Sequence, residues 1–204
     1  MTKIKLCGMR RIQDIDYANM LSPDFIGFVF APSSKRYVTF GEAGKLRERL
    51  KSGIIPVGVF VDEPPENIIQ LIRTGIINAV QLHGSEDNEY IKALRTQTNC
   101  PIIQAFKIKS SADTKKAQHS AADFVMTDSG AGSGKVFDYS LIKNISRDFF
   151  LAGGLTAENV HDTIQKIKPY AVDASSSLET DGVKDINKMT AFVNAVRYGK
   201  DETK

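Results

Sequence analysis

The sequence repeats one pattern eight times: a short run rich in β-branched and aromatic residues, then a stretch with the apolar spacing of a helix. The runs begin near residues 3, 24, 55, 78, 102, 123, 149 and 170. Helices are predicted over residues 11–20, 42–52, 65–74, 87–97, 112–121, 138–145, 156–167 and 185–198. Thr156 is the predicted start signal of the seventh helix, with Asn159 three residues on. Repeated βα units of this kind predict a parallel sheet.

Eight such units in one chain favour closure into a single-domain (β/α)₈ TIM barrel over residues 1–204, because closure leaves no sheet edge unprotected. The alternative is an open, doubly wound sheet. In a barrel the functional residues are expected at the carboxyl ends of the strands. The residues at those ends are Cys7, Phe30, Asp62, His83, Lys107, Asp128, Gly153 with Gly154, and Ser175 with Ser176.

Composition narrows the functional class. The chain of 204 residues is 42% hydrophobic and 25% charged, as in ordinary globular proteins, and it contains no apolar run long enough for a membrane helix. The N-terminus lacks the features of a secretory signal, so we expect a cytoplasmic protein that does not bind membranes. The net charge of +3 comes from lysines and arginines scattered among acidic residues, which argues only weakly for a nucleic-acid partner and fits a small anionic substrate just as well, so no nucleic-acid partner is expected.

The two cysteines are expected to be free thiols. Cys7 ends the first predicted strand, whereas Cys100 precedes the fifth, so they should lie at opposite edges of the sheet. A strand of five or six residues separates those edges by about 17–20 Å, well beyond the ~7 Å limit between Cα atoms for a disulfide. Cys100 is expected to be structural. A lone cysteine is usually a packing residue too, so Cys7 needs support from its surroundings.

Alternation along the strands supplies that support. Successive strand residues point to opposite faces, so Cys7 should point into the barrel mouth, on the face opposite Leu6. By the same rule Gln81, His83 and Asp128 point inward. For His83 a satisfied core histidine is the more usual interpretation, and Asp62 is more typical of a turn or helix cap than of a catalyst. The convergence of three titratable groups at one barrel mouth favours a catalytic role for Cys7 and Asp128.

The last two predicted strands end in glycines and serines rather than in titratable residues. Gly153, Gly154, Ser175 and Ser176 place small residues where backbone N–H groups can approach an anion, which predicts a phosphate site; a tight turn and a solvated loop are the alternatives. Another glycine-rich segment, residues 129–134, lacks the spacing of a P-loop and is interpreted as a lid beside the strand that precedes it.

The chain resembles the phosphoribosylanthranilate isomerase family along nearly its whole length. The resemblance rests on "KLCGMR", "GFVFAPSSKRYV", "VQLHG", "TDSGAGSGKVFD", "LAGGLTAENV" and "VDASSSLE", in the order and spacing of that family. It implies an isomerase of tryptophan biosynthesis with a (β/α)₈ fold. The residues it implies are Cys7 as general base, Asp128 as general acid, Arg36 as the ligand of the aromatic carboxylate, and Gly153, Gly154, Ser175 and Ser176 as the phosphate site. We also expect His83 and Asp173 to bind substrate.

The implied reaction is an Amadori rearrangement of a phosphorylated aminoribose into an aminoketose, which needs one acid and one base. Asp128 then requires a raised pKa, and Cys7 requires a pKa lowered by nearby positive charge, for which Lys5 and Arg36 are the candidates. No metal or organic cofactor is expected, because the nitrogen of the substrate serves as electron sink. The three histidines lack the spacing of zinc ligands.

Other functions remain open from the sequence. The barrel could bind a phosphorylated metabolite without catalysis, or could be a related barrel isomerase or lyase acting on another phosphorylated metabolite. A basic nucleic-acid-binding module is a further alternative, which salt-sensitive retention on DNA or RNA would support. Typical histidine-pathway isomerases resemble this layout but would have aspartate where Cys7 stands, so the thiol discriminates between them. The sequence is compatible with a monomer or a homodimer.

Overall fold

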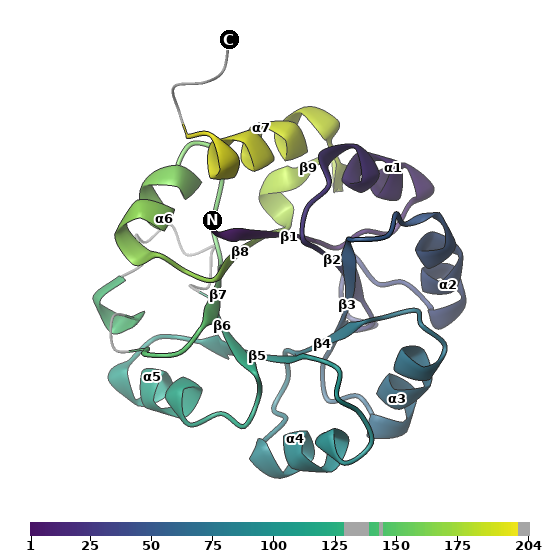
Figure 1. The fold of residues 1–204 in the computed structure, drawn as a ribbon, viewed down its shortest axis with the longest axis vertical. Coiled ribbons are helices and arrows are strands. Elements are labelled where there is room, and N and C mark those ends of the chain that lie inside the picture. The colour runs from purple at the N-terminus through teal and green to yellow at the C-terminus, as the bar shows by residue number, and fades with distance from the viewer. Residues whose placement is uncertain (129–138, 143–144, 200–204) are drawn as a thin grey trace.

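Eight parallel strands close into a barrel in chain order in the computed structural model, which describes residues 1–128, 139–142 and 145–199 (Figure 1). The strands are β1 (Lys3–Cys7), β2 (Phe25–Val29), β3 (Ile55–Phe60), β4 (Ala79–Leu82), β5 (Ile102–Lys107), β6 (Phe124–Asp128), β7 (Phe149–Ala152) and β8 (Ala171–Ala174). The first strand pairs with the eighth, so the sheet has no open edge. The predicted (β/α)₈ barrel is confirmed, and the open-sheet alternative is wrong.

Seven α-helices surround the barrel in the described part of the chain (Figure 1). They are α1 (Ile12–Leu21), α2 (Phe40–Arg49), α3 (Pro65–Arg73), α4 (Asn88–Arg95), α5 (Ser111–Gln118), α6 (Val160–Ile167) and α7 (Ile186–Arg197). After β8 the chain forms a 3₁₀ turn, Ser176–Leu178, and a short hairpin of β9 (Glu179–Thr180) and β10 (Val183–Lys184). No described helix has the length and apolar character needed to cross a membrane.

Two of the predicted helices differ from the structure. Of the helix expected over 138–145, the described residues Tyr139–Ile142 form a 3₁₀ turn, and residues 138, 143 and 144 lie outside the described part. The helix expected from Thr156 begins at Val160 instead. The reason is local: the Asn159 side-chain oxygen accepts a hydrogen bond from the Thr156 N–H at 2.9 Å, which holds residues 156–159 in a turn before the helix.

Strand alternation separates two apolar layers, as the sequence predicts. Outward-facing strand residues such as Leu6 and Leu82 pack beneath the helices in the larger layer. Inward-facing residues such as Met126 and Phe150 fill the barrel interior toward the amino ends of the strands. Near the carboxyl ends Cys7 packs in a small separate apolar cluster. The interior is therefore closed below by packed side chains and opens only toward the carboxyl ends.

Strand register fixes the relative height of the polar residues at that open end. Asp128 pairs in register with Ala152, and Ala152 pairs with Asp173. Where β8 pairs with β1 and closes the barrel, Asp173 lies in register with Lys5, which precedes Cys7 by two residues. The ends of β6, β8 and β1 therefore present their charged groups at one level around the mouth of the barrel.

Candidate active site

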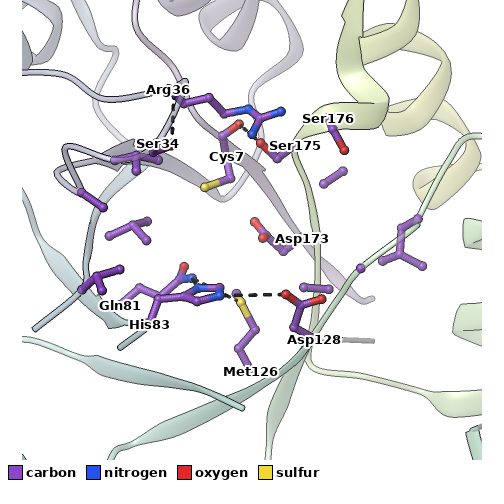
Figure 2. Close-up of a pocket in the computed structure, with 18 of the residues that line it drawn as sticks. Cys7, Ser34, Arg36, Gln81, His83, Met126, Asp128, Asp173, Ser175 and Ser176 are labelled. Carbon is purple, nitrogen blue, oxygen red and sulfur yellow. Dashed lines mark hydrogen bonds and ion pairs between the residues drawn. The ribbon is translucent and has the colours of Figure 1, made fainter. Parts of the chain in front are cut away.

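The carboxyl ends of the strands surround a cavity of about 580 Å³ (Figure 2). All the site residues predicted from the sequence line it: Cys7, Arg36, His83, Asp128, Gly153, Gly154, Asp173, Ser175 and Ser176. Its wall also includes Ser33 and Ser34 of the loop after β2, Gln81, and Lys107. A volume of this size is typical of pockets that enclose a small molecule. The structure therefore brings the whole predicted set to one place.

Asp62 does not line this cavity, and its contacts explain why. Its Oδ1 atom accepts hydrogen bonds from the N–H and the hydroxyl of Ser85, at 2.7 and 2.8 Å. The residue has a left-handed backbone with φ of 52°. These contacts agree with the turn-forming role indicated by the sequence. The predicted lid over residues 129–134 lies outside the described residues.

Cys7 is buried at the end of β1, with its side chain facing the cavity (Figure 2). Gly27 lies beside it on β2, where an added Cβ atom would stand 2.6 Å from the Cys7 sulfur, so only glycine leaves room for the thiol. Burial raises the pKa of Cys7, while the charges of Lys5 and Lys184 act in the opposite direction. The predicted lowering of this pKa is wrong for the protein as it stands, because desolvation of the thiolate outweighs both lysines. Like Cys100, Cys7 is a free thiol, as expected.

Beneath the thiol, Lys5 and Asp173 form a buried ion pair across the seam between β1 and β8. The Lys5 ammonium is fully buried and lies 2.8 Å from Asp173 Oδ1. Burial is the largest single effect and acts to lower the pKa of Lys5, but the charges and hydrogen bonds of Asp173 and Cys7 together outweigh it, and the net direction is upward. Lys5 therefore stays protonated as a fixed positive charge next to Cys7. Asp173, expected to bind substrate, lines the cavity and is also the counterion of this lysine.

His83 and Asp128 face each other on another side of the cavity, with 3.9 Å between His83 Nε2 and Asp128 Oδ2 (Figure 2). His83 Nδ1 lies 3.0 Å from the amide nitrogen of Gln81, and when that amide donates to Nδ1 the ring proton is on Nε2, toward Asp128. Burial lowers the pKa of His83, against the opposing effect of Asp128 and Asp173. A neutral imidazole that donates toward Asp128 is the expected state.

Arg36 reaches the cavity from the loop after β2 and extends over Cys7 toward Ser175 (Figure 2). Its path crosses Gly8, where φ is 85° and an added Cβ atom would stand 2.3 Å from Arg36 Cδ. Its Nε and Nη2 atoms donate to the two carboxylate oxygens of Glu179, at 2.6 and 2.7 Å. Glu179 was not among the predicted site residues, although it is the last residue of the "VDASSSLE" motif.

The predicted phosphate loops adjoin each other at the ends of β7 and β8. Gly153 and Gly154 have positive φ values of 94° and 63°, which turn the backbone in a way that other residues rarely adopt. Ser176 begins the 3₁₀ turn after β8. The Ser175 carbonyl accepts from Lys184 Nζ at 2.9 Å, so a positive charge stands behind this loop. Sequence reasoning missed Lys184, because it belongs to the hairpin that follows rather than to either loop.

Comparisons with known proteins agree with this geometry. Residues 4–195 match the family model of N-(5'-phosphoribosyl)anthranilate (PRA) isomerase. The N-(5'-phosphoribosyl)anthranilate isomerase of Endomicrobium trichonymphae is 42% identical over 97% of this chain and 99% of its own length. The enzyme of the same name from Caldanaerobacter subterraneus is 43% identical over 97% of this chain and 98% of its own.

Solved structures give the same result. The crystal structure of phosphoribosyl anthranilate isomerase from Thermotoga maritima superposes with a TM-score of 0.88, at 34% identity, covering 96% of this chain and 98% of that one. A second structure, solved in complex with reduced 1-(o-carboxyphenylamino)-1-deoxyribulose 5-phosphate, gives a TM-score of 0.86 at 32% identity over the same shares. With its family motifs gathered around one cavity of a closed barrel, this chain belongs to the phosphoribosylanthranilate isomerase family.

Proposed function

We propose that this protein is an enzyme of tryptophan biosynthesis that converts N-(5'-phosphoribosyl)anthranilate into 1-(2-carboxyphenylamino)-1-deoxyribulose 5-phosphate. The observation that carries the proposal is one cavity lined by a buried thiol, a carboxyl group, an arginine and two turns of small residues. An acid, a base and two anion sites are what this substrate requires, since it carries a carboxylate at one end and a phosphate at the other.

In the proposed mechanism Asp128 gives its proton to the ring oxygen of the ribose as the bond from that oxygen to C1 breaks. The electron pair of the broken bond goes to the oxygen, and the nitrogen lone pair forms a cationic C1=N bond. The Nε2–H of His83, directed toward Asp128, then stabilises the carboxylate that remains. Asp128 is the proposed acid because its carboxyl group lines the cavity and faces His83.

Cys7 then removes the proton from C2 of the iminium ion. The C2–H electron pair forms a C1=C2 bond, the C=N π pair returns to nitrogen, and the resulting enaminol tautomerises to the ketone. No electrons leave the substrate, so we propose that no metal or organic cofactor takes part. The fixed charges of Lys5 and Lys184 favour the thiolate that this step needs, against the cost of burial.

Arg36 is proposed to bind the aromatic carboxylate, and backbone N–H groups at Gly153, Gly154, Ser175 and Ser176 to bind the phosphate. Positive φ at the two glycines and the lysine behind Ser175 support the second assignment. His83 and Asp173 are proposed to contact the sugar, because both line the same cavity. We also propose a cytoplasmic protein, active as a monomer or a homodimer, without nucleic-acid or membrane partners.

The test is to mix the purified protein with freshly made phosphoribosylanthranilate and to follow the loss of anthranilate-type fluorescence. We expect multiple turnovers in wild-type protein, and loss of turnover in Cys7→Ala and Asp128→Ala variants that remain folded. Tight binding of the same compound without turnover in the wild type would contradict the proposal and favour a barrel that only binds phosphosugars.

A further inference from the structure

We propose that Glu179 and Lys184, two residues behind the cavity wall, make Arg36 selective for a substrate carboxylate: Glu179 fixes the guanidinium, and Lys184 cancels the charge of Glu179. This inference rests on the proposed function and adds two positioning residues that act through Arg36. Both belong to the β9–β10 hairpin, which in sequence has the composition of a solvated loop.

The contact between Arg36 and Glu179 uses one edge of the guanidinium and leaves the other available. Nε and Nη2 donate to the two carboxylate oxygens of Glu179. The second edge of the guanidinium, formed by Nη1 and the other Nη2 proton, is not used in this contact. The cavity wall includes Arg36 but neither Glu179 nor Lys184. Glu179 therefore holds the arginine from behind, and a second carboxylate can approach it from the cavity.

The charges explain why a third residue is needed. A lone Arg36–Glu179 pair has no net charge, so a substrate carboxylate would meet attraction and repulsion of similar size. The Lys184 ammonium, with a side chain only 1% exposed, lies 2.7 Å from Glu179 Oε1. The three groups together carry one positive charge. Burial raises the pKa of Glu179, but hydrogen bonds from Arg36 and Lys184 outweigh it and lower the pKa to about 2, so Glu179 is ionised at neutral pH. Burial lowers the pKa of Lys184 below its ordinary value of 10.5, while the hydrogen bond and charge of Glu179 oppose this, and the count applies to the protonated lysine.

The same lysine connects the two anion sites. Lys184 Nζ also donates to the Ser175 carbonyl in the proposed phosphate loop, at 2.9 Å. The Ser175 hydroxyl in turn donates to the Cys7 carbonyl at 3.1 Å. A test of selectivity must therefore separate an effect on the carboxylate from a general disturbance of the phosphate loop.

The test measures binding by calorimetry, so that it does not depend on turnover. The two ligands are reduced 1-(o-carboxyphenylamino)-1-deoxyribulose 5-phosphate and the same compound without its carboxyl group. Lys184→Met, which leaves Arg36 and Glu179 with no net charge, should weaken binding of the carboxylated ligand about tenfold or more, the usual scale for a charge-assisted hydrogen bond. Glu179→Gln removes a negative charge, but it should weaken this binding by a similar factor, because a guanidinium that is no longer held loses its orientation toward the ligand carboxylate. The ligand without the carboxyl group should change less than threefold in both variants.

Lys188 and Glu89 provide matched controls. Lys188 Nζ, in the first turn of α7, donates to the backbone carbonyl of Glu179 at 2.7 Å, so Lys188→Met removes a nearby lysine charge without touching the Glu179 carboxylate. Glu89 pairs only with Lys92 among the contacts described for its carboxylate, on the surface of α4. Lys188→Met and Glu89→Gln should leave both affinities within about twofold.

Two results would overturn the inference: unchanged affinity for the carboxylated ligand in folded Glu179→Gln protein, or equal losses for both ligands, which would indicate a purely structural role. In an Arg36→Ala background Glu179→Gln should have no further effect, and an undiminished effect would also contradict it. Wild-type turnover of phosphoribosylanthranilate is measured in parallel. Its absence would refute the proposed function, whereas the ratio of the two affinities would still decide this inference.

Discussion

Replacement of Lys5 by methionine is expected to destabilise the barrel strongly, because it leaves the Asp173 carboxylate buried without its counterion. The side chains of this pair are 0% and 10% exposed, and their charged atoms are 2.8 Å apart. Methionine is similar in length to lysine, so the main loss is electrostatic rather than a cavity. Breaking a buried pair by removing one partner costs about 3–5 kcal/mol. For a domain of this size, that corresponds to a fall in Tm of about 6–20 °C.

Lys3 provides an internal control on the same strand. It forms the same type of contact with Asp24, at 2.7 Å, but the side chains of that pair are 48% and 30% exposed. Lys3→Met should therefore cost no more than about 1 kcal/mol, the usual limit for an exposed pair. The two variants differ mainly in burial, so the difference between them isolates the effect of desolvation.

The assay is urea unfolding followed by circular dichroism for wild type, Lys5→Met, Lys3→Met and the double variant Lys5→Met/Asp173→Asn. The double variant should regain much of the free energy of unfolding that Lys5→Met loses, because it contains no buried charge without a counterion. The pKa of Lys5 is raised in the folded protein, so its contribution is complete below the ordinary lysine value of 10.5 and disappears as the pH rises through the folded pKa. Equal losses in the two single variants, or no recovery in the double variant, would refute the argument.

Four further predictions concern the proposed site. Cys7→Ala and Asp128→Ala should each lower kcat about 100-fold or more, and near-normal kcat in either would contradict its role. Because burial raises the pKa of Cys7, kcat/KM should keep rising with pH beyond neutrality, and a flat profile from pH 7 to 9 would contradict a thiolate base. Arg36→Ala should chiefly raise KM for phosphoribosylanthranilate, so an unchanged KM in steady-state assays counts against the carboxylate contact. Gly154→Val should raise KM substantially and weaken competition by inorganic phosphate, whereas Ser176→Ala, which keeps its N–H, should do much less; equal effects would argue against a backbone site.

Much of the site could be predicted from the sequence because, in a closed parallel barrel, the last residue of every strand lies at the same end of the barrel. Once eight strands are counted, their carboxyl ends must meet, and alternation decides which of two neighbouring residues faces inward. That rule placed Cys7, His83 and Asp128 correctly on the cavity wall. A different signal, the preference of aspartate for turns and helix caps, set apart Asp62, which is held in a turn by Ser85.

Three features were beyond that reasoning, each for a physical reason. The contacts of Glu179 and Lys184 depend on how a short hairpin folds back, and no strand period governs it. The pKa of Cys7 is the net result of burial and opposing charges, and sequence cannot give their balance. Helix α6 begins at Val160 rather than at Thr156 because the Asn159 side chain accepts a hydrogen bond from the Thr156 N–H. The apolar spacing of the helix does not reveal this local hydrogen bond.

The pairing of Lys5 with Asp173 also has a consequence for how the protein assembles. The two residues are 168 positions apart, on the first and last strands of the barrel. A partly folded chain that had enclosed β1 before β8 docked would hold an ammonium group in an apolar interior with no counterion. Such an intermediate is penalised, so docking of the final strand and burial of this lysine should occur together. On a ribosome, the thiol environment would then form only after β8 has emerged, and chains stopped before β8 should remain loose enough for proteases to remove.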